Sequence, residues 1–193
     1  EVINSGFEKT SLKDNSFDLV ISNFPFGSYT VHDPQYNSLS PSIHDYFFLK
    51  SLDKVKEGGL VIALTSRFTM DKTDSSIREA FARRAELVAA YRLPETAFQD
   101  NAHTSVVTDL LIFQKRPKGQ EIDEEQIEKL NWIKSDFLQL DDETYHNVNQ
   151  YFHENPNNIW GKTSSEGRMY GRNELTVKSE NKDDYLALAK ASR

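Results

Sequence analysis

The sequence predicts an α/β fold built on a doubly wound, mostly parallel sheet. Short runs of apolar residues bounded by turn residues occur at 17–22, 60–64 and 87–93, and such runs are typical of buried strands. Two segments with apolar residues at helical spacing, 42–56 and 75–84, separate these runs. With a long β-branched run at 104–114 as a fourth strand, the order fits the second half of such a sheet, ending in a hairpin.

Each element has its own local signals. In the first helix, the apolar residues Ile43, Phe47, Phe48, Leu52 and Val55 share one face, and the segment Glu57-Gly58-Gly59 is expected to end it. Asp74 can cap the second helix. The polar segment 27–42 is a long loop for a compact domain, and loops of this length are commonly functional or disordered. A lid over a target base, with Tyr29 and Tyr36 stacking on nucleotides, and a disordered tip both stay open.

The pattern changes after residue 116. Pro117-Lys118-Gly119 indicates a boundary, so we expect a partial α/β domain over 1–116 and a small mixed extension or linker over 117–193. The segment 161–174, rich in Gly and Ser, is expected to be mobile. Short helices are expected in the extension at 144–153 and 183–191, while the acidic segment 121–130 is either a short helix or a solvated linker.

Composition excludes several kinds of protein. The 193 residues include no cysteine, which excludes disulfides and thiolate metal sites. The residues His32, Asp33 and His103 lack the spacing of a ligand set, so no metal is predicted. No apolar run is long enough for a transmembrane helix, and no signal peptide is present, so we expect a cytoplasmic protein.

The net charge of −7 argues against strong nucleic-acid binding by this chain alone. Contacts to phosphates need Lys and Arg, whereas acidic residues are concentrated here at 121–128 and 141–143. If the chain acts on DNA, we expect the basic groove to lie elsewhere.

The segment Asn23-Phe24-Pro25-Phe26-Gly27 follows the first predicted strand and suits the binding of an aromatic amine. The amide oxygen of Asn23 and the carbonyl of Phe24 can each accept one N–H, which frees a lone pair otherwise delocalised into the ring. Pro25 stiffens the backbone and has no N–H to compete. The ring of Phe26 can stack on the base, and Gly27 allows the backbone a close turn.

This segment resembles the Asn/Asp/Ser-Pro-Pro-Tyr/Phe/Trp motif of amino-group methyltransferases that use S-adenosylmethionine, with Phe24 in place of the first Pro. The wider resemblance is to the large bacterial N6-adenine DNA methyltransferases of plasmids, phages and conjugative elements, often fused to a helicase of the SNF2 type. It covers roughly 1–116, and more loosely 151–156 and 170–171. It rests on Gly6-Phe7-Glu8, Ile43-His44-Asp45-Tyr46-Phe47-Phe48, Gly58-Gly59-Leu60-Val61, Thr65-Ser66-Arg67-Phe68-Thr69-Met70-Asp71, Arg92-Leu93-Pro94, Ala97-Phe98, Thr104-Ser105-Val106-Val107-Thr108-Asp109 and Gln114-Lys115-Arg116.

The resemblance implies a Rossmann-like methyltransferase fold that moves a methyl group from S-adenosylmethionine to the N6 amine of adenine in DNA, within a restriction-modification setting. DNA and a helicase domain in the same polypeptide are the implied partners. The implied catalytic residues are Asn23, Phe24, Pro25 and Phe26. Phe7 and Glu8 are implied contacts to the cofactor, while Gly27, Tyr29 and Arg67 are candidate substrate contacts; for Arg67 a surface salt bridge is the alternative.

The sequence contains no Gly-x-Gly turn, the usual cradle for the methionine part of the cofactor in this fold. We therefore expect the cofactor-binding half to lie outside these 193 residues, and the isolated chain to be inactive. Two other functions stay open: a non-catalytic scaffold or DNA-positioning module of a helicase-linked protein, and methylation of RNA or of a protein glutamine.

Overall fold

The computed structural model describes residues 2–27, 29–98, 106–140, 144–167 and 173–179. The chain divides into two compact units. The first comprises 1–65, 76–89 and 111–129, and the second comprises 66–75, 90–110 and 130–193.

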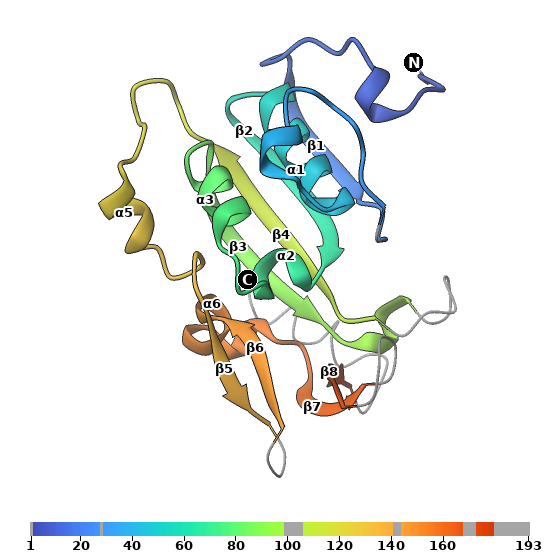
Figure 1. The fold of residues 1–193 in the computed structure, drawn as a ribbon, viewed down its shortest axis with the longest axis vertical. Helices are drawn as coiled ribbons and strands as arrows, with labels where there is room; N and C mark the ends of the chain where they lie inside the picture. Colours follow the sequence, from blue (N-terminus) through green and yellow to red (C-terminus); the bar gives the residue numbers. More distant parts are fainter. Residues whose placement is uncertain (1, 28, 99–105, 141–143, 168–172, 180–193) are drawn as a thin grey trace. The chain divides into compact units, whose positions relative to one another are not determined.

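A four-stranded sheet has the strand order β1-β2-β4-β3. The strands are β1 (Phe17–Asn23), β2 (Val55–Ser66), β3 (Ala85–Leu93) and β4 (Thr108–Lys115). β1 and β2 are parallel, with Leu19 opposite Leu60 and Asn23 opposite Leu64, whereas β4 runs against β2 and β3 (Figure 1). The predicted Rossmann-like α/β class is therefore confirmed, including the closing hairpin of β3 and β4. Residues 104 and 105, expected to begin the last strand, lie outside the described residues.

In the first unit, α1 (Ile43–Lys54) and α3 (Ser76–Ala82) lie on one face of the sheet (Figure 1). The ring of Phe48 is 5.6 Å from the rings of Phe81 and Phe113, so the two helices and β4 share an aromatic core. The predicted helix 42–56 ends earlier than expected, because Val55 and the following residues join β2 as an extended strand.

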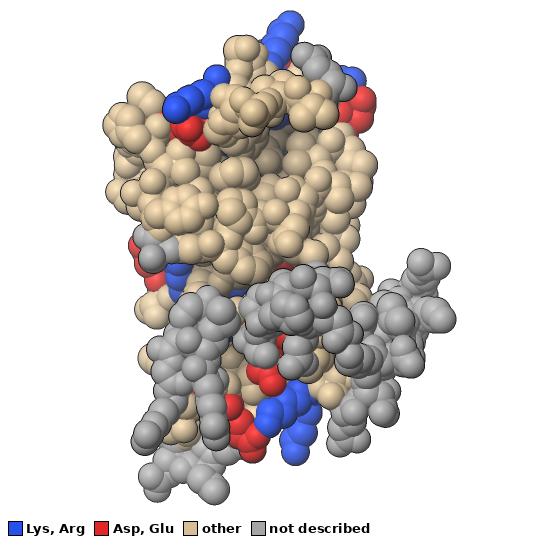
Figure 2. All heavy atoms as spheres, turned by 90° about the vertical axis from the view of Figure 1, so that its right-hand side faces the viewer, with Lys and Arg blue, Asp and Glu red and all other residues tan. Residues whose placement is uncertain are grey.

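The edge of the sheet at β1 carries exposed apolar side chains within the described residues. Phe17, Leu19 and Ile21 alternate along β1 and are 38%, 45% and 69% exposed. In the described sheet β1 pairs with β2 and forms the edge. Figure 2 faces this side and shows a broad area without Lys, Arg, Asp or Glu. Parallel strands of α/β proteins are normally covered on both faces, so this surface is one that a further segment or partner would bury.

The second unit contains two antiparallel hairpins, formed by β5 (Ser135–Gln139) with β6 (Tyr145–Asn149) and by β7 (Lys162–Gly167) with β8 (Glu174–Lys178). The expected helix at 144–153 is wrong in its first half, which pairs with β5. The helix α6 begins only at Gln150, because the side chain of Asn149 accepts a hydrogen bond from the Tyr151 N–H and caps it. The expected mobility of 161–174 is wrong for Lys162–Gly167, which is a paired strand.

The remaining elements are short. They are α2 (Phe68–Asp71), α5 (Glu124–Glu128), α6 (Gln150–Glu154) and the 3-10 helices Phe7–Lys9, Asn37–Leu39, Glu95–Phe98 and Pro156–Asn158. α5 confirms the helix alternative within 121–130, and a capping box of Asp123 and Gln126 starts it. The helix expected at 183–191 lies outside the described residues. Among the helices described, none has the length and apolar character needed to cross a bilayer.

Candidate active site

Asn23 is the last residue of β1 and lies at the carboxyl end of the parallel β1–β2 pair. The residue is exposed. The backbone N–H of the next residue, Phe24, donates to the carbonyl of Leu64 at 3.0 Å. Open α/β sheets bind their ligands at the carboxyl ends of the strands. The fold thus places an exposed Asn23 at the edge where open α/β sheets usually bind ligands, on a backbone held by β2.

Phe24 occupies the core of the first unit. It is 2% exposed, and its ring packs edge-on against Phe48, with ring centroids 4.6 Å apart, and in a tilted arrangement against Phe47, at 5.6 Å. In the methyltransferase motif that this segment resembles, a proline at this position stiffens the backbone. Here the buried ring anchors the backbone at the same point by packing beneath α1.

The rest of the segment is more open. Pro25 and Phe26 are half-buried, Gly27 is exposed, and Tyr29 is 58% exposed. A Cβ atom on Gly27 would lie 2.9 Å from Cε1 of Tyr29, closer than such contacts occur. The absence of a side chain at Gly27 therefore leaves room for the ring of Tyr29 close to the Gly27 backbone.

The loop after the motif is anchored along α1. Tyr36, expected to stack on nucleotides, is buried, and its hydroxyl donates to Oδ2 of Asp53 at 2.6 Å. Burial, followed by the Asp53 carboxylate, raises the pKa of Tyr36. The stacking prediction is wrong for Tyr36, because its hydroxyl group and ring are both used internally. The disordered-tip alternative is wrong for residues 31–39, which are fixed against α1 by Tyr36 and Asp33.

The anchor at Asp33 is a buried carboxylate. Its Oδ2 accepts hydrogen bonds from the Tyr46 hydroxyl at 2.9 Å and from Nζ of Lys50 at 3.0 Å, and its Oδ1 accepts from the Gln35 N–H at 3.2 Å. Burial raises the pKa of Asp33, but the hydrogen bonds from Lys50 and Tyr46 outweigh burial and hold the pKa below its ordinary value. Sequence reasoning missed these residues, although a lysine among the apolar positions of a helix is a usable signal.

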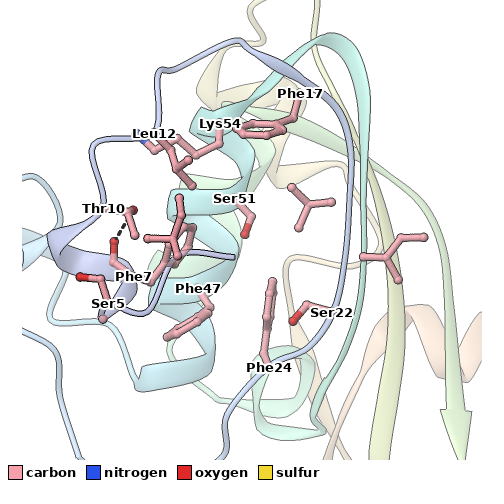
Figure 3. Close-up of a pocket in the computed structure, with 14 residues that line it drawn as sticks. Ser5, Phe7, Thr10, Leu12, Phe17, Ser22, Phe24, Phe47, Ser51 and Lys54 are labelled. Atoms are coloured by element: carbon pink, nitrogen blue, oxygen red, sulfur yellow. Dashed lines mark hydrogen bonds between the residues drawn. The ribbon is translucent and has the colours of Figure 1, made fainter. Parts of the chain in front are cut away.

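A cavity of about 540 Å³ lies between the N-terminal segment, β1 and α1 (Figure 3). Phe7 and Phe24 both line it, so the structure brings a predicted cofactor contact and a predicted catalytic residue to one cavity. Glu8 and Asn23 are not among its lining residues. The lining is mainly apolar: Ile3, Ser5, Gly6, Phe7, Thr10, Leu12, Phe17, Val20, Ile21, Ser22, Phe24, Phe47, Ser51 and Lys54.

Phe7 lines this cavity and packs against two aromatic residues of α1. Its ring centroid is 5.2 Å from that of Phe47 and 6.3 Å from that of Tyr46. Figure 3 shows Phe7, Phe47 and Phe24 around the same end of the cavity. The apolar walls and aromatic rings of the cavity suit a ligand with a flat, uncharged ring system. The cavity volume is within the range of small-molecule sites.

Arg67 belongs to the second unit and is buried. Its guanidinium lies 3.4 Å from Asp71 Oδ2 and 3.2 Å from Glu174 Oε2, and it stacks 4.2 Å above the ring of Phe68. Arg67 therefore forms salt bridges, as the alternative prediction stated, but they are buried rather than at the surface. A contact from Arg67 to substrate stays a prediction.

Three charged residues from separate elements form a buried network in the second unit. Arg92 donates from Nε and Nη2 to both oxygens of Asp109, at 2.8 and 2.9 Å, and from Nη2 to Asp71 Oδ1 at 2.9 Å. Its guanidinium also lies 4.2 Å over the ring of Phe152. Asp71 Oδ1 accepts the backbone N–H of Asn149 at 3.0 Å, which ties the start of α6 to α2.

No cluster of three or more His, Asp or Glu side chains placed to hold a metal ion occurs among the residues that the structure describes.

No protein-family model matches this chain. A curated relative is the "Defense against restriction protein B" of Escherichia phage P1, which is 33% identical over 121 residues. The match covers 58% of this chain and 5% of that protein, so the chain spans a small part of its relative's length.

Several solved structures share features of the fold. A Listeria monocytogenes chain, whose proposed identity is a class I S-adenosylmethionine-dependent methyltransferase, has a TM-score of 0.46 at 20% identity and covers 61% of this chain and 37% of its own. A component of a type I restriction-modification assembly has a TM-score of 0.45 at 20% identity, over 63% of this chain and 29% of that one.

Proposed function

We propose that the polypeptide containing this chain transfers a methyl group from S-adenosylmethionine to the N6 amine of adenine in DNA, and that this chain supplies the half that binds the target base. One observation carries the proposal: the exposed Asn23 at the carboxyl end of β1, on a backbone fixed by the hydrogen bond from Phe24 to Leu64. The curated relative, named for defence against restriction, supports an assignment to DNA modification. A fused helicase of the SNF2 type and a cytoplasmic location belong to the same proposal.

The chemistry asks the chain to hold an amine and expose its lone pair. The amide oxygen of Asn23 and the carbonyl of Phe24 accept the two N–H groups, while Pro25 has no N–H to compete. The half-buried ring of Phe26 lies next along the chain as a platform for the base. The adenine must leave the duplex to reach these groups, because its amine is otherwise within the stack.

The methyl donor supplies an electrophilic carbon on a sulfonium. As the new C–N bond formed, the C–S bond would break and its electron pair would stay on sulfur. The amine then loses a proton to water, so no side-chain base is required before attack. Of the described residues, Phe7 is the proposed contact to the donor's adenine, supported by its position in the lining of the apolar cavity, and Glu8, which is half-buried, is the weaker candidate.

The open side of β1 supports a cofactor-binding half supplied by another part of the polypeptide. An additional strand and covering helices would bury Phe17, Leu19 and Ile21, as doubly wound sheets require. We therefore expect the 193-residue chain alone to bind S-adenosylmethionine too weakly for calorimetric detection.

The same surface predicts self-association of the isolated chain. We expect an apparent mass that rises with concentration in size-exclusion chromatography with light scattering, because an exposed apolar edge strand recruits another chain. The double variant Leu19→Lys, Ile21→Lys should remain monomeric over the same concentrations. Phe137→Lys is the matched control, since Phe137 is 73% exposed on β5; if it suppresses association equally, the association does not occur through β1.

The direct test of function uses the longer natural polypeptide, labelled S-adenosylmethionine and DNA duplexes with or without adenine. We expect N6-methyladenine after nuclease digestion, and a fall in kcat of about 10²–10³-fold in Asn23→Ala, the usual loss for one preorganised hydrogen-bonding partner. Asn131→Ala is the control, because that side chain bonds Glu154 in the second unit.

Each other outcome has a definite meaning. Label found in RNA or protein but not in DNA would move the proposal to another substrate. Wild-type activity in Asn23→Ala would remove Asn23 from the mechanism. A polypeptide that binds S-adenosylmethionine yet methylates nothing would favour a scaffold or DNA-positioning module.

A further inference from the structure

Lys50 of α1 lies where three segments of the first unit meet. It is 5% exposed. Its Nζ is 3.0 Å from Oδ2 of Asp33, in the loop after the Asn23–Phe26 segment. The same Nζ lies 5.2 Å from the ring centroid of Phe7, in the N-terminal segment, and 5.8 Å from that of Tyr46 on α1. One ammonium group therefore contacts both the loop and the N-terminal segment.

The contact with Asp33 joins Lys50 to a hydrogen-bonded turn of the loop. The Asp33 carbonyl accepts the N–H groups of Tyr36 and Asn37 at 2.9 and 3.0 Å, and the Asp33 N–H donates to Oδ1 of Asn37 at 3.0 Å. Asp33 is thus the first residue of a turn, and both its backbone and its side chain form hydrogen bonds. Because its carboxylate is fixed by Lys50, the whole turn is fixed to α1.

The contact between Lys50 and Phe7 involves the segment that is predicted to bind the cofactor. Phe7 packs on Phe47, and Phe47 packs on Phe24, with ring centroids 5.2 and 5.6 Å apart. Lys50 lies about one helical turn beyond Phe47 on α1. The α1 surface around Lys50 is therefore shared by Phe7 and Phe24, which line one cavity, and by the loop that follows the motif.

We propose that Lys50 is a positioning residue that couples the segment carrying Phe7 to the loop that follows the base-binding motif. The proposal rests on the proposed function. Lys50 touches neither substrate in it, and acts by holding Asp33 and the Phe7 ring in one arrangement. A lysine suits this position, because its ammonium both donates to a carboxylate and lies over aromatic faces.

Steady-state kinetics of the longer polypeptide separate coupling from ordinary packing. We expect Lys50→Met to raise KM about tenfold for both S-adenosylmethionine and DNA. Asp33→Asn should raise KM mainly for DNA, and Phe7→Leu mainly for S-adenosylmethionine. In the Lys50→Met background, Phe7→Leu should add little further, because the arrangement it perturbs is already lost. Lys50→Arg keeps the charge but not the compact ammonium, so it should raise both KM values less than Lys50→Met does.

Lys56→Met is the matched control. Lys56 forms an exposed ion pair with Asp18, and the variant should leave both KM values at wild-type levels. If Lys50→Met changes only the amount of active enzyme, with both KM values unchanged, or if it shifts a single KM, the coupling is refuted.

Hydrogen exchange of the same polypeptide without ligands provides a readout independent of activity. Lys50→Met should speed exchange in both 31–39 and 3–10, and Lys56→Met in neither. Should the wild type show no methyl transfer, the proposed function fails, and exchange alone then decides the coupling. Faster exchange in both segments supports it, whereas a change in one or none overturns it.

Discussion

Replacing Arg92 by methionine is expected to lower the free energy of unfolding by about 3–5 kcal/mol, because it leaves buried carboxylates without their partner. Arg92, Asp71 and Asp109 are each at most 2% exposed. In the native chain the guanidinium satisfies Asp109 through two parallel hydrogen bonds and Asp71 through a third. Urea denaturation of the wild-type and variant chains would measure the difference.

The loss should shrink as the pH falls. Burial raises the pKa of Asp109, and the Arg92 charge, which lowers it, does not fully offset burial. The pKa of Arg92 moves up, since the attraction of Asp109 and Asp71 exceeds the cost of burial, so the arginine stays charged. Without Arg92 the pKa of Asp109 rises further. The folded variant then binds a proton more tightly than the unfolded chain, so it gains stability as the pH falls through the raised folded pKa.

Two further variants identify the cause. The double change Arg92→Met, Asp109→Asn should recover part of the loss, because one uncompensated charge has been removed. Arg83→Met is the control for loss of an arginine, since Arg83 forms an exposed ion pair with Glu124, and it should cost at most about 1 kcal/mol. A loss at Arg92 that is independent of pH and unchanged in the double variant would contradict the electrostatic account.

This network could not be predicted from the sequence. Asp71, Arg92 and Asp109 are far apart in the chain and belong to α2, β3 and β4. Each looks locally like an ordinary charged residue near the end of an element. Only the packing of these elements shows that their charges are buried and paired.

The strands and the position of the motif were predictable for a simple reason. Short apolar runs indicate strands without long-range information, and Asn23 follows such a run directly, so its place at a strand end is a local property. The burial predicted for 17–22 is wrong within the described residues, because β1 forms the edge of the sheet and most of its apolar side chains are exposed. The extension lacks such runs. The segment Tyr145–Asn149 becomes a strand because it pairs with Ser135–Gln139, and a partner in the sequence cannot be recognised from the segment itself.

The loop at 27–42 could also be predicted only in part. The sequence predicts a long polar connection at 27–42, but its order depends on Asp33 and Tyr36 reaching Lys50, Tyr46 and Asp53 on α1. These contacts require the helix to be in place. The sequence alone does not tell whether an aromatic residue in a loop is exposed, as Tyr29 is, or buried as an anchor, as Tyr36 is. Only the fold distinguishes the two cases.

Phe24→Pro, which would restore the usual residue of the motif, is expected to destabilise the chain by about 3–5 kcal/mol, the range for deleting a buried phenyl group. The ring of Phe24 packs against Phe47 and Phe48, and proline would vacate most of that volume. Proline also has no N–H, so the hydrogen bond to the Leu64 carbonyl would be lost. Urea denaturation would measure the change, with Phe137→Leu on an exposed site as a control within about 0.5 kcal/mol.

Phe24→Leu separates the two roles of this residue. Leucine keeps the backbone N–H bonded to Leu64 and keeps the carbonyl proposed to accept the amine, while it removes the aromatic contacts. We expect a stability loss smaller than that of Phe24→Pro and, in the longer polypeptide, methyl transfer within about tenfold of wild type, because only packing around the acceptor changes. If Phe24→Pro is as stable as wild type, the buried ring does not hold the motif. If Phe24→Leu keeps its stability but loses methyl transfer, the side chain and not the carbonyl acts on the substrate.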